Sequence, residues 1–95
     1  MAQAPAPHTA SPAVLRVTTD AASLAGIFAG DQVLIDTTAE PRNGDLVAVR
    51  LDTGDAACFR VHGPFLMPQS HRHLPALPIA GADVLGTVRQ LWRDM

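Results

Sequence analysis

The histidines are the first side chains in this sequence to weigh as metal ligands. His71 and His73 flank Arg72, and on an extended segment the two imidazoles would lie on one face. Zinc requires three or four ligands, but no further zinc-binding side chain is close in the sequence. Arg72 also adds a positive charge between the two histidines. The pattern therefore predicts an exposed loop without a metal, and no other motif indicates a cofactor.

Carboxylates are numerous enough to raise the possibility of acid–base chemistry or a calcium loop. Most of them stand beside glycine or at the end of an apolar run, where Asp bonds to the backbone of its own turn. These residues are Asp20, Asp31, Asp36, Asp45, Asp52 and Asp55. Asp52-Thr53-Gly54 has the composition of an aspartic-protease motif, but the second copy that such a site needs is missing. We therefore expect these carboxylates to stabilise turns.

The single cysteine, Cys58, excludes an intramolecular disulfide and a multi-cysteine zinc site. It falls in an apolar run, which predicts a buried, unreactive thiol. Such sparing use of cysteine is typical of a reducing compartment, so we expect a cytoplasmic protein.

Charge and hydropathy exclude several classes of function. The 95 residues carry a net charge of −2, and the seven cations are all arginines scattered along the chain, so direct nucleic-acid binding is not expected. A phosphate-binding loop of the G-x-x-x-x-G-K type is impossible without lysine. No apolar run approaches the roughly 20 residues of a membrane-spanning helix, and we expect no membrane association.

Short strands are expected to position the polar residues. Residues 1–12 are rich in alanine and proline and predict a flexible tail before one domain over residues 13–95. The domain shows about six or seven β-rich runs with turn signals roughly every ten residues, which predicts a mainly β barrel or roll. The runs are 13–17, 30–38, 44–52, 56–63, 65–69 and 83–92, the last interrupted by Gly86, with 70–79 as extended chain or an edge strand. Residues 20–28 predict a helical turn with Asp20 as its N-cap.

Six short motifs occur in an order that is specific to one family. They are GIFAGD (26–31), PRNGD (41–45), FRVHG (59–63), LMPQS (66–70), LPI (77–79) and VLGTV (84–88). Together they resemble the LexA-like self-cleaving peptidases, which include SOS repressors, UmuD mutagenesis proteins and phage repressors, with signal peptidases as distant relatives. The resemblance covers residues 14–92 and implies a small LexA-like β-roll of the β-clip type.

The chemistry of that family requires a serine nucleophile and a lysine that accepts its proton. Counting back from Asp31, the serine position falls on Ala21, or on Ala22 in relatives whose spacer is one residue shorter. The lysine position, directly before Arg60, is Phe59, and the sequence contains no lysine at all. The resemblance therefore implies a family member without the catalytic pair, and so a protein that is not an enzyme.

A substitute pair is the alternative in which the chain remains a peptidase. Some signal peptidases use histidine in place of lysine, so Ser23 and His62 are chemically able to act as nucleophile and base. Ser23, however, lies two residues beyond the serine position. His62 lies three residues beyond Phe59, and an odd offset on a strand places it on the opposite face.

The family also suggests what a domain without the catalytic pair does. LexA-like domains pair as homodimers, largely through C-terminal β structure, so we expect a dimerisation or protein-binding module whose partner is a second copy or a related peptidase-fold protein. The expected interface residues are Val84, Leu85, Val88, Leu91 and Trp92. A third interpretation, a small β-barrel adaptor unrelated to peptidases, would require the Gly-Asp turns to be coincidental.

Overall fold

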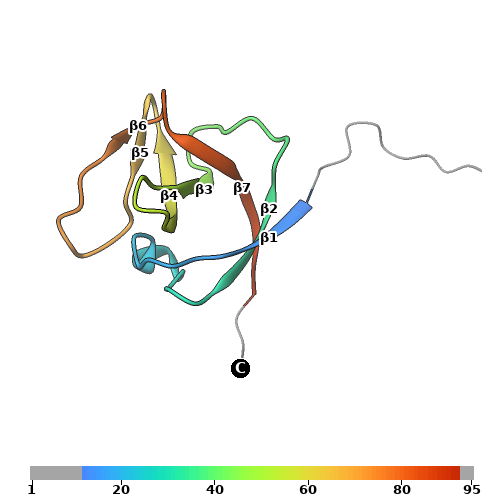
Figure 1. Cartoon of the computed structure of the whole chain (residues 1–95). Coiled ribbons are helices and arrows are strands. Elements are labelled where there is room, and N and C mark those ends of the chain that lie inside the picture. The colour runs from blue at the N-terminus through green and yellow to red at the C-terminus, as the bar shows by residue number, and fades with distance from the viewer. Residues whose placement is uncertain (1–11, 93–95) are drawn as a thin grey trace, which may run out of the picture.

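Seven antiparallel strands form one sheet in the computed structural model, which describes residues 12–92. The strand order in the sheet is β1-β2-β7-β3-β4-β5-β6 (Figure 1). The strands are β1 (Pro12–Arg16), β2 (Gln32–Asp36), β3 (Leu46–Arg50), β4 (Ala56–His62), β5 (Phe65–Met67), β6 (Leu77–Pro78) and β7 (Asp83–Trp92). The prediction of a mainly β fold is confirmed. Of the expected tail, residues 1–11 lie outside the described residues, and Pro12 begins β1.

Strand β7 joins the two parts of the sheet, because it pairs with β3 over its first half and with β2 over its second half. The expectation that Gly86 interrupts this strand was wrong, since β7 runs unbroken from Asp83 to Trp92. Glycine is required there for a different reason. A Cβ at position 86 would lie 2.9 Å from the carbonyl oxygen of Asp36, so a side chain there would require β2 to shift.

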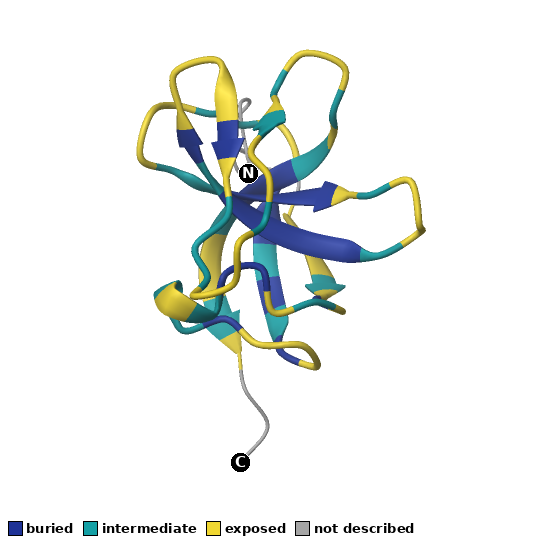
Figure 2. Ribbon diagram, turned by 90° about the vertical axis from the view of Figure 1, so that its left-hand side faces the viewer, coloured by how far each residue is buried: buried dark blue, intermediate teal, exposed yellow. Residues whose placement is uncertain are grey.

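The sheet carries a separate apolar cluster on each of its faces. Alternate residues of β4 divide between the two, because successive side chains of a strand point to opposite faces. Cys58 belongs to the first cluster, together with Val33 and Ile35 of β2. Phe59 and Val61 belong to the second cluster. Figure 2 shows the buried residues along the central strands and the exposed residues at the hairpin tips.

The segment between β1 and β2 covers the first cluster and links two distant strands. Thr18 N donates a hydrogen bond to Ala56 O (2.8 Å), and Ala56 N donates to Thr18 Oγ1 (2.8 Å), which ties the chain after β1 to the start of β4. The expected helical turn is only a short 3₁₀ turn, η1 (Ser23–Ala25).

The prediction that Asp20 caps this turn was wrong. The N-cap residue is Ala22, and no side-chain hydrogen bond caps the turn. The Asp20 carboxylate instead accepts a hydrogen bond from Ala29 N (2.7 Å), which closes the loop ahead of β2. Within residues 12–92, no helix is long and apolar enough to cross a membrane.

Candidate functional site

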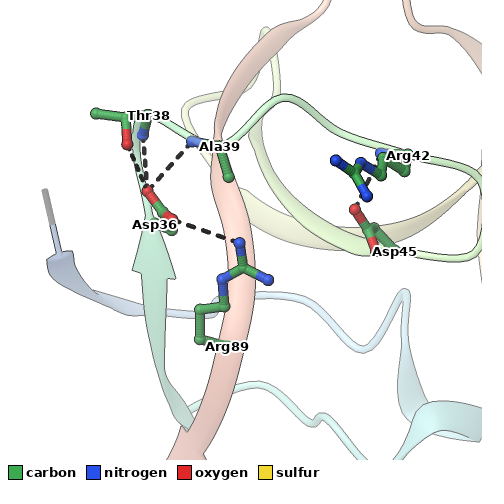
Figure 3. Close-up of polar contacts among 6 residues, drawn as sticks. All are labelled: Asp36, Thr38, Ala39, Arg42, Asp45 and Arg89. Atoms are coloured by element: carbon green, nitrogen blue, oxygen red, sulfur yellow. Dashed lines mark hydrogen bonds and ion pairs between the residues drawn. The ribbon is translucent and has the colours of Figure 1, made fainter. Parts of the chain in front are cut away.

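The two Gly-Asp turns have the same hydrogen-bonded structure. In the first, Phe28 N donates to Asp31 Oδ2 (2.9 Å) and Asp31 N donates to Phe28 O (3.0 Å). In the second, Arg42 N donates to Asp45 Oδ2 (2.9 Å; Figure 3) and Asp45 N donates to Arg42 O (3.0 Å). The glycine before each aspartate has a positive φ, 96° and 89°, which favours glycine. These carboxylates stabilise the turns that precede β2 and β3, as the sequence predicted.

Ala21, one of the two positions that the family resemblance assigns to a nucleophile, is fixed by backbone bonds to the segment after β5. Gln69 N donates to Ala21 O (2.8 Å), and Leu24 N donates to Gln69 O (2.7 Å). The Ala21 side chain is buried in the second apolar cluster, whereas that of the next residue, Ala22, is buried in the first. The loop therefore presents position 21, and not position 22, to the face of the sheet on which Phe59 lies.

Phe59 reaches this face from the middle of β4, opposite Val47 of β3. It is almost fully buried and belongs to the same apolar cluster as Ala21. The two residues also line one cavity of about 330 Å³. We call it the Ala21 cavity. The remaining lining residues are Thr19, Asp20, Leu51, Arg72, Leu74, Pro75 and Leu77.

The polar groups of the Ala21 cavity stand among mostly apolar walls. Thr19 Oγ1 accepts a hydrogen bond from Ala21 N (3.3 Å), and Asp20 is held by Ala29 as described above. Arg72 is exposed, and in the described part of the chain its guanidinium has no hydrogen-bond or ion-pair partner. No lysine or histidine lines the cavity to take a proton from the Thr19 hydroxyl. The arrangement suits the binding of an apolar side chain.

Sequence reasoning placed only Ala21 and Phe59 of the lining residues together, and it did not predict the cavity that they share. Leu51 follows β3, while Leu74 and Leu77 come from the proline-punctuated segment before β7. The only signal in the sequence was the presence of two leucines in an otherwise polar, proline-rich stretch. Their packing against Phe59 depends on how this segment folds back over β4, which a strand pattern does not reveal.

Ser23 and His62, the substitute pair, are not brought together by the fold. Ser23 is half-buried in η1, and His62 is exposed at the end of β4. His62 lies on the face of β4 that carries Cys58, opposite to Phe59, and neither member of the pair lines the Ala21 cavity. No hydrogen bond joins the two side chains in the structure of residues 12–92.

The other candidate ligands and nucleophiles are isolated. His71 and His73 are exposed, and the described residues contain no group of three or more metal-binding side chains. Cys58 is fully buried and free, and burial raises the pKa of its thiol to about 11. The thiol is therefore protonated at neutral pH, in agreement with the predicted unreactive cysteine.

The five expected interface residues of β7 do not all face outward. Val84 packs against the second apolar cluster, and Leu85, Val88 and Leu91 pack against the first. Only Trp92 is strongly exposed, at 43% of its surface. Beyond Thr87, β7 pairs with β2 on one side and, among the described residues, with no strand on the other.

Comparisons with known proteins agree with this geometry. The model of the family described as Peptidase S24-like matches residues 4–81. The LexA repressor of Limosilactobacillus reuteri (strain DSM 20016) is 32% identical over 73 residues, which amount to 74% of this chain and 35% of the repressor. The LexA repressor of Limosilactobacillus reuteri subsp. reuteri (strain JCM 1112) gives the same values. The chain thus spans about a third of the length of the curated relatives it matches.

Proposed function

This chain belongs to the Peptidase S24-like family, and from that premise we propose that it binds another protein chain without cleaving it. The observation that carries the proposal is the pair Ala21 and Phe59. The family resemblance assigns these positions to the nucleophile and the base, and both residues line one cavity. The third interpretation, an adaptor unrelated to peptidases, is excluded by the family match.

The absence of peptidase activity follows from the groups at these two positions. A methyl group cannot attack a carbonyl carbon, and a phenyl ring cannot accept a proton. Lysine is absent from the sequence, and His62 lies on the opposite face of β4, so no neighbouring residue takes over the role of the base. The free, buried cysteine fits a reducing compartment, and we place the protein in the cytoplasm on that ground.

Association is proposed to occur at the second half of β7. Residues 88–92 offer a strand edge that the described part of the sheet does not cover, and such an edge is a template for pairing with another strand. Trp92, at the end of this edge, lies on the sheet face opposite to the first cluster and is 43% exposed. A second copy of the chain, paired edge to edge along residues 88–92, would bring its strand against the Trp92 side chain.

Incubation of the purified chain tests the catalytic half of the proposal. Material held at pH 7 and at pH 10, alone and with a full-length LexA-like repressor whose own nucleophilic serine has been replaced by alanine, should remain intact by mass spectrometry. Self-cleavage or cleavage of the repressor that disappears in Ser23→Ala or His62→Ala would refute the proposal in favour of the substitute pair. Cleavage that survives both substitutions would also refute it, because an unassigned nucleophile would then be at work.

Sedimentation velocity tests the association. The chain should sediment as a concentration-dependent dimer, and Trp92→Glu should shift it to monomer because it places a charge in the proposed interface. Phe65→Glu is the matched control, since Phe65 is 46% exposed but lies on β5, away from the β1-β2-β7 face. A monomer at all concentrations that also fails to pair with a LexA-like domain would contradict the proposal.

A further inference from the structure

We propose that the β4–β5 hairpin carries a docking surface for an acidic, amphipathic helix of a partner protein. The surface is separate from the edge of β7, because β3 and β4 lie between β7 and β5 in the sheet (Figure 1). Either proposal can therefore hold without the other. We call the surface the hairpin face, and it consists of two cross-strand pairs, Arg60 with Met67 and His62 with Phe65.

The hairpin face points away from the Ala21 cavity. Val61 and Leu66 form the pair between the two pairs of the hairpin face, and both are buried in the second apolar cluster together with Phe59. Because successive side chains of a strand point to opposite faces, the hairpin face lies on the side of the sheet that carries Cys58.

The described part of the chain leaves the hairpin face uncovered. Phe65 is 46% exposed and Met67 is 36% exposed, and neither belongs to the first apolar cluster on the same side of the sheet. Leu24 adjoins the hairpin, since Leu24 N donates to Gln69 O (2.7 Å), and it is itself exposed. Aromatic residues, methionine and arginine are the residue types that protein interfaces favour, so this composition suits a docking surface.

The hairpin face also carries a positive charge that the protein does not neutralise. Residues 56–82 contain two arginines and three histidines but no carboxylate. Arg60 donates through Nη1 to Gly44 O (2.6 Å) and through Nε to the side-chain oxygen of Gln69 (3.3 Å). Both acceptors are neutral, so they fix the guanidinium in place beside the apolar side chains and leave its charge uncompensated.

Carboxylates next to the hairpin in the fold do not change this balance. Asp55 directly precedes β4, and the strand separates it from His62 by roughly 20 Å at about 3.3 Å per residue. Asp45 accepts a hydrogen bond from Arg42 N and lines a different cavity, together with Arg42 and Arg89. A ligand on the hairpin face would therefore meet a positive local potential in a chain whose net charge is −2.

Charge selects a short acidic protein segment among the possible occupants. Duplex DNA presents a negative charge about every 1.7 Å, and a single-stranded nucleic acid or an anionic membrane is also an extended polyanion, which a chain of net charge −2 with few cations on this face would not hold. A second copy, paired by a two-fold axis at this face, would bring like charges together. An acidic segment places its charge at Arg60 and avoids both penalties.

The neighbouring strand favours a helix as the form of this segment. Strand addition to β5 is blocked, because β6 already pairs with Phe65 and Leu66. The partner must therefore lie on the hairpin face itself, and an exposed sheet face is commonly covered by a helix. Apolar residues at i, i+3 or i+4, and i+7 would pack on Phe65 and Met67, and acidic residues beside this stripe would meet Arg60.

A displayed library of helical peptides, randomised over one face of the helix and selected against the immobilised full chain, tests the chemistry of the partner. Enriched sequences should combine large apolar residues at helical spacing with aspartate or glutamate. Enrichment of basic sequences, or no enrichment over the bare support, would overturn the proposal.

Fluorescence anisotropy of an enriched, fluorescein-labelled peptide then locates the site on the chain. Phe65→Ser should weaken binding at least about tenfold, because the apolar anchor is lost. Val14→Ser is the matched control, since Val14 is 51% exposed on β1 and should have no effect. A peptide that binds Phe65→Ser as tightly as the wild type occupies another site and would contradict the assignment.

The charge of Arg60 is tested by two variants that both remove the guanidinium. Arg60→Gln should bind the peptide about twofold to fivefold more weakly than Arg60→Lys at low salt, and the difference should shrink at high salt. Equal affinities of the two variants at low salt would show that charge does not select the partner. Circular dichroism confirms that each variant is folded.

Other occupants of the hairpin face give distinct results. Binding of phosphatidylserine vesicles or of a single-stranded oligonucleotide that is lost in Phe65→Ser would overturn the proposal. A dimer that dissociates in Phe65→Glu, and not in Trp92→Glu, would overturn both this proposal and the pairing at β7. A dimer that dissociates only in Trp92→Glu, in a chain that enriches no acidic helix, would contradict this proposal alone.

Discussion

Ala21 and Phe59, from a loop and from the middle of β4, lie in one apolar cluster and line one cavity. The loop reaches Phe59 because Gln69 holds it through backbone bonds to Ala21 and Leu24. At position 59, to which the family resemblance assigns a lysine, an aromatic ring therefore packs against the cavity wall.

Phe59→Lys is expected to lower the free energy of unfolding by about 3–5 kcal/mol at pH 7, because it replaces a buried ring with a buried charge. Burial lowers the pKa of such an amine below its unfolded value, so the penalty is absent well above that value and grows as pH falls towards the folded pKa. The gap to the wild type should therefore narrow from pH 7 to pH 10 in urea unfolding. Phe59→Met is the control, with a smaller gap that does not change with pH.

Gly86→Ala should destabilise the sheet by about 1–3 kcal/mol, since its Cβ would press on the carbonyl of Asp36 at 2.9 Å. Gly54→Ala is the comparison, because Gly54 has open space around it and only a positive φ of 92° to be strained. Urea unfolding of both variants measures the difference. Equal losses would mean that β2 and β7 move apart at little cost.

Thr87→Val should leave stability unchanged or raise it by up to about 1 kcal/mol. The hydroxyl of Thr87 is buried and, within residues 12–92, has no hydrogen-bond partner, so its removal relieves an uncompensated loss of hydration. Thermal unfolding of the variant, with Thr87→Ser as control, tests this. A clear loss in Thr87→Val would show that the hydroxyl is satisfied in solution.

Asp36 is expected to make folding sensitive to acid. Hydrogen bonds from Thr38 N and Thr38 Oγ1, both at 2.9 Å, are the main causes that lower its pKa, and Arg89 at 3.4 Å adds to them (Figure 3). A lowered folded pKa gives stability that is present above about pH 4 and is lost as pH falls through that folded value. In acid unfolding curves, Asp36→Asn should reduce the fall of the free energy of unfolding with decreasing pH. Arg89→Gln should reduce it less.

Cys58 should resist a thiol reagent such as Ellman's reagent at pH 8 in the native chain and react once urea unfolds it. Burial raises the pKa of its thiol from 9.0 to about 11, so the native state holds the proton more tightly. The linked contribution to stability is complete below pH 9 and is lost as pH rises through 11. Rapid labelling without denaturant would show that β4 opens locally.

Several features could be predicted from local sequence because they depend on residues close to one another. Each Gly-Asp turn needs only a glycine at positive φ and an aspartate that accepts a hydrogen bond from the backbone N–H three residues earlier. Both turns were therefore predicted from their sequence motifs. The strand character of the runs that became β2, β3 and β4 follows likewise from β-branched and apolar content. The alternation along β4 also sufficed to separate His62 from Phe59.

Contacts between distant segments could not be predicted from the sequence and were visible only in the tertiary structure. The role of Gly86 depends on how closely β2 passes, and the role of Asp20 depends on where the loop returns to Ala29. The packing of Leu74 and Leu77 against the cluster of Phe59, and the position of Arg72, depend on a segment with no strong periodicity of its own. Sequence alone determined that no lysine is present and which residue types stand at positions 21 and 59, because chemistry is a property of residue type. Only packing decided which side chains fill the resulting cavity, because long-range contacts leave no local pattern.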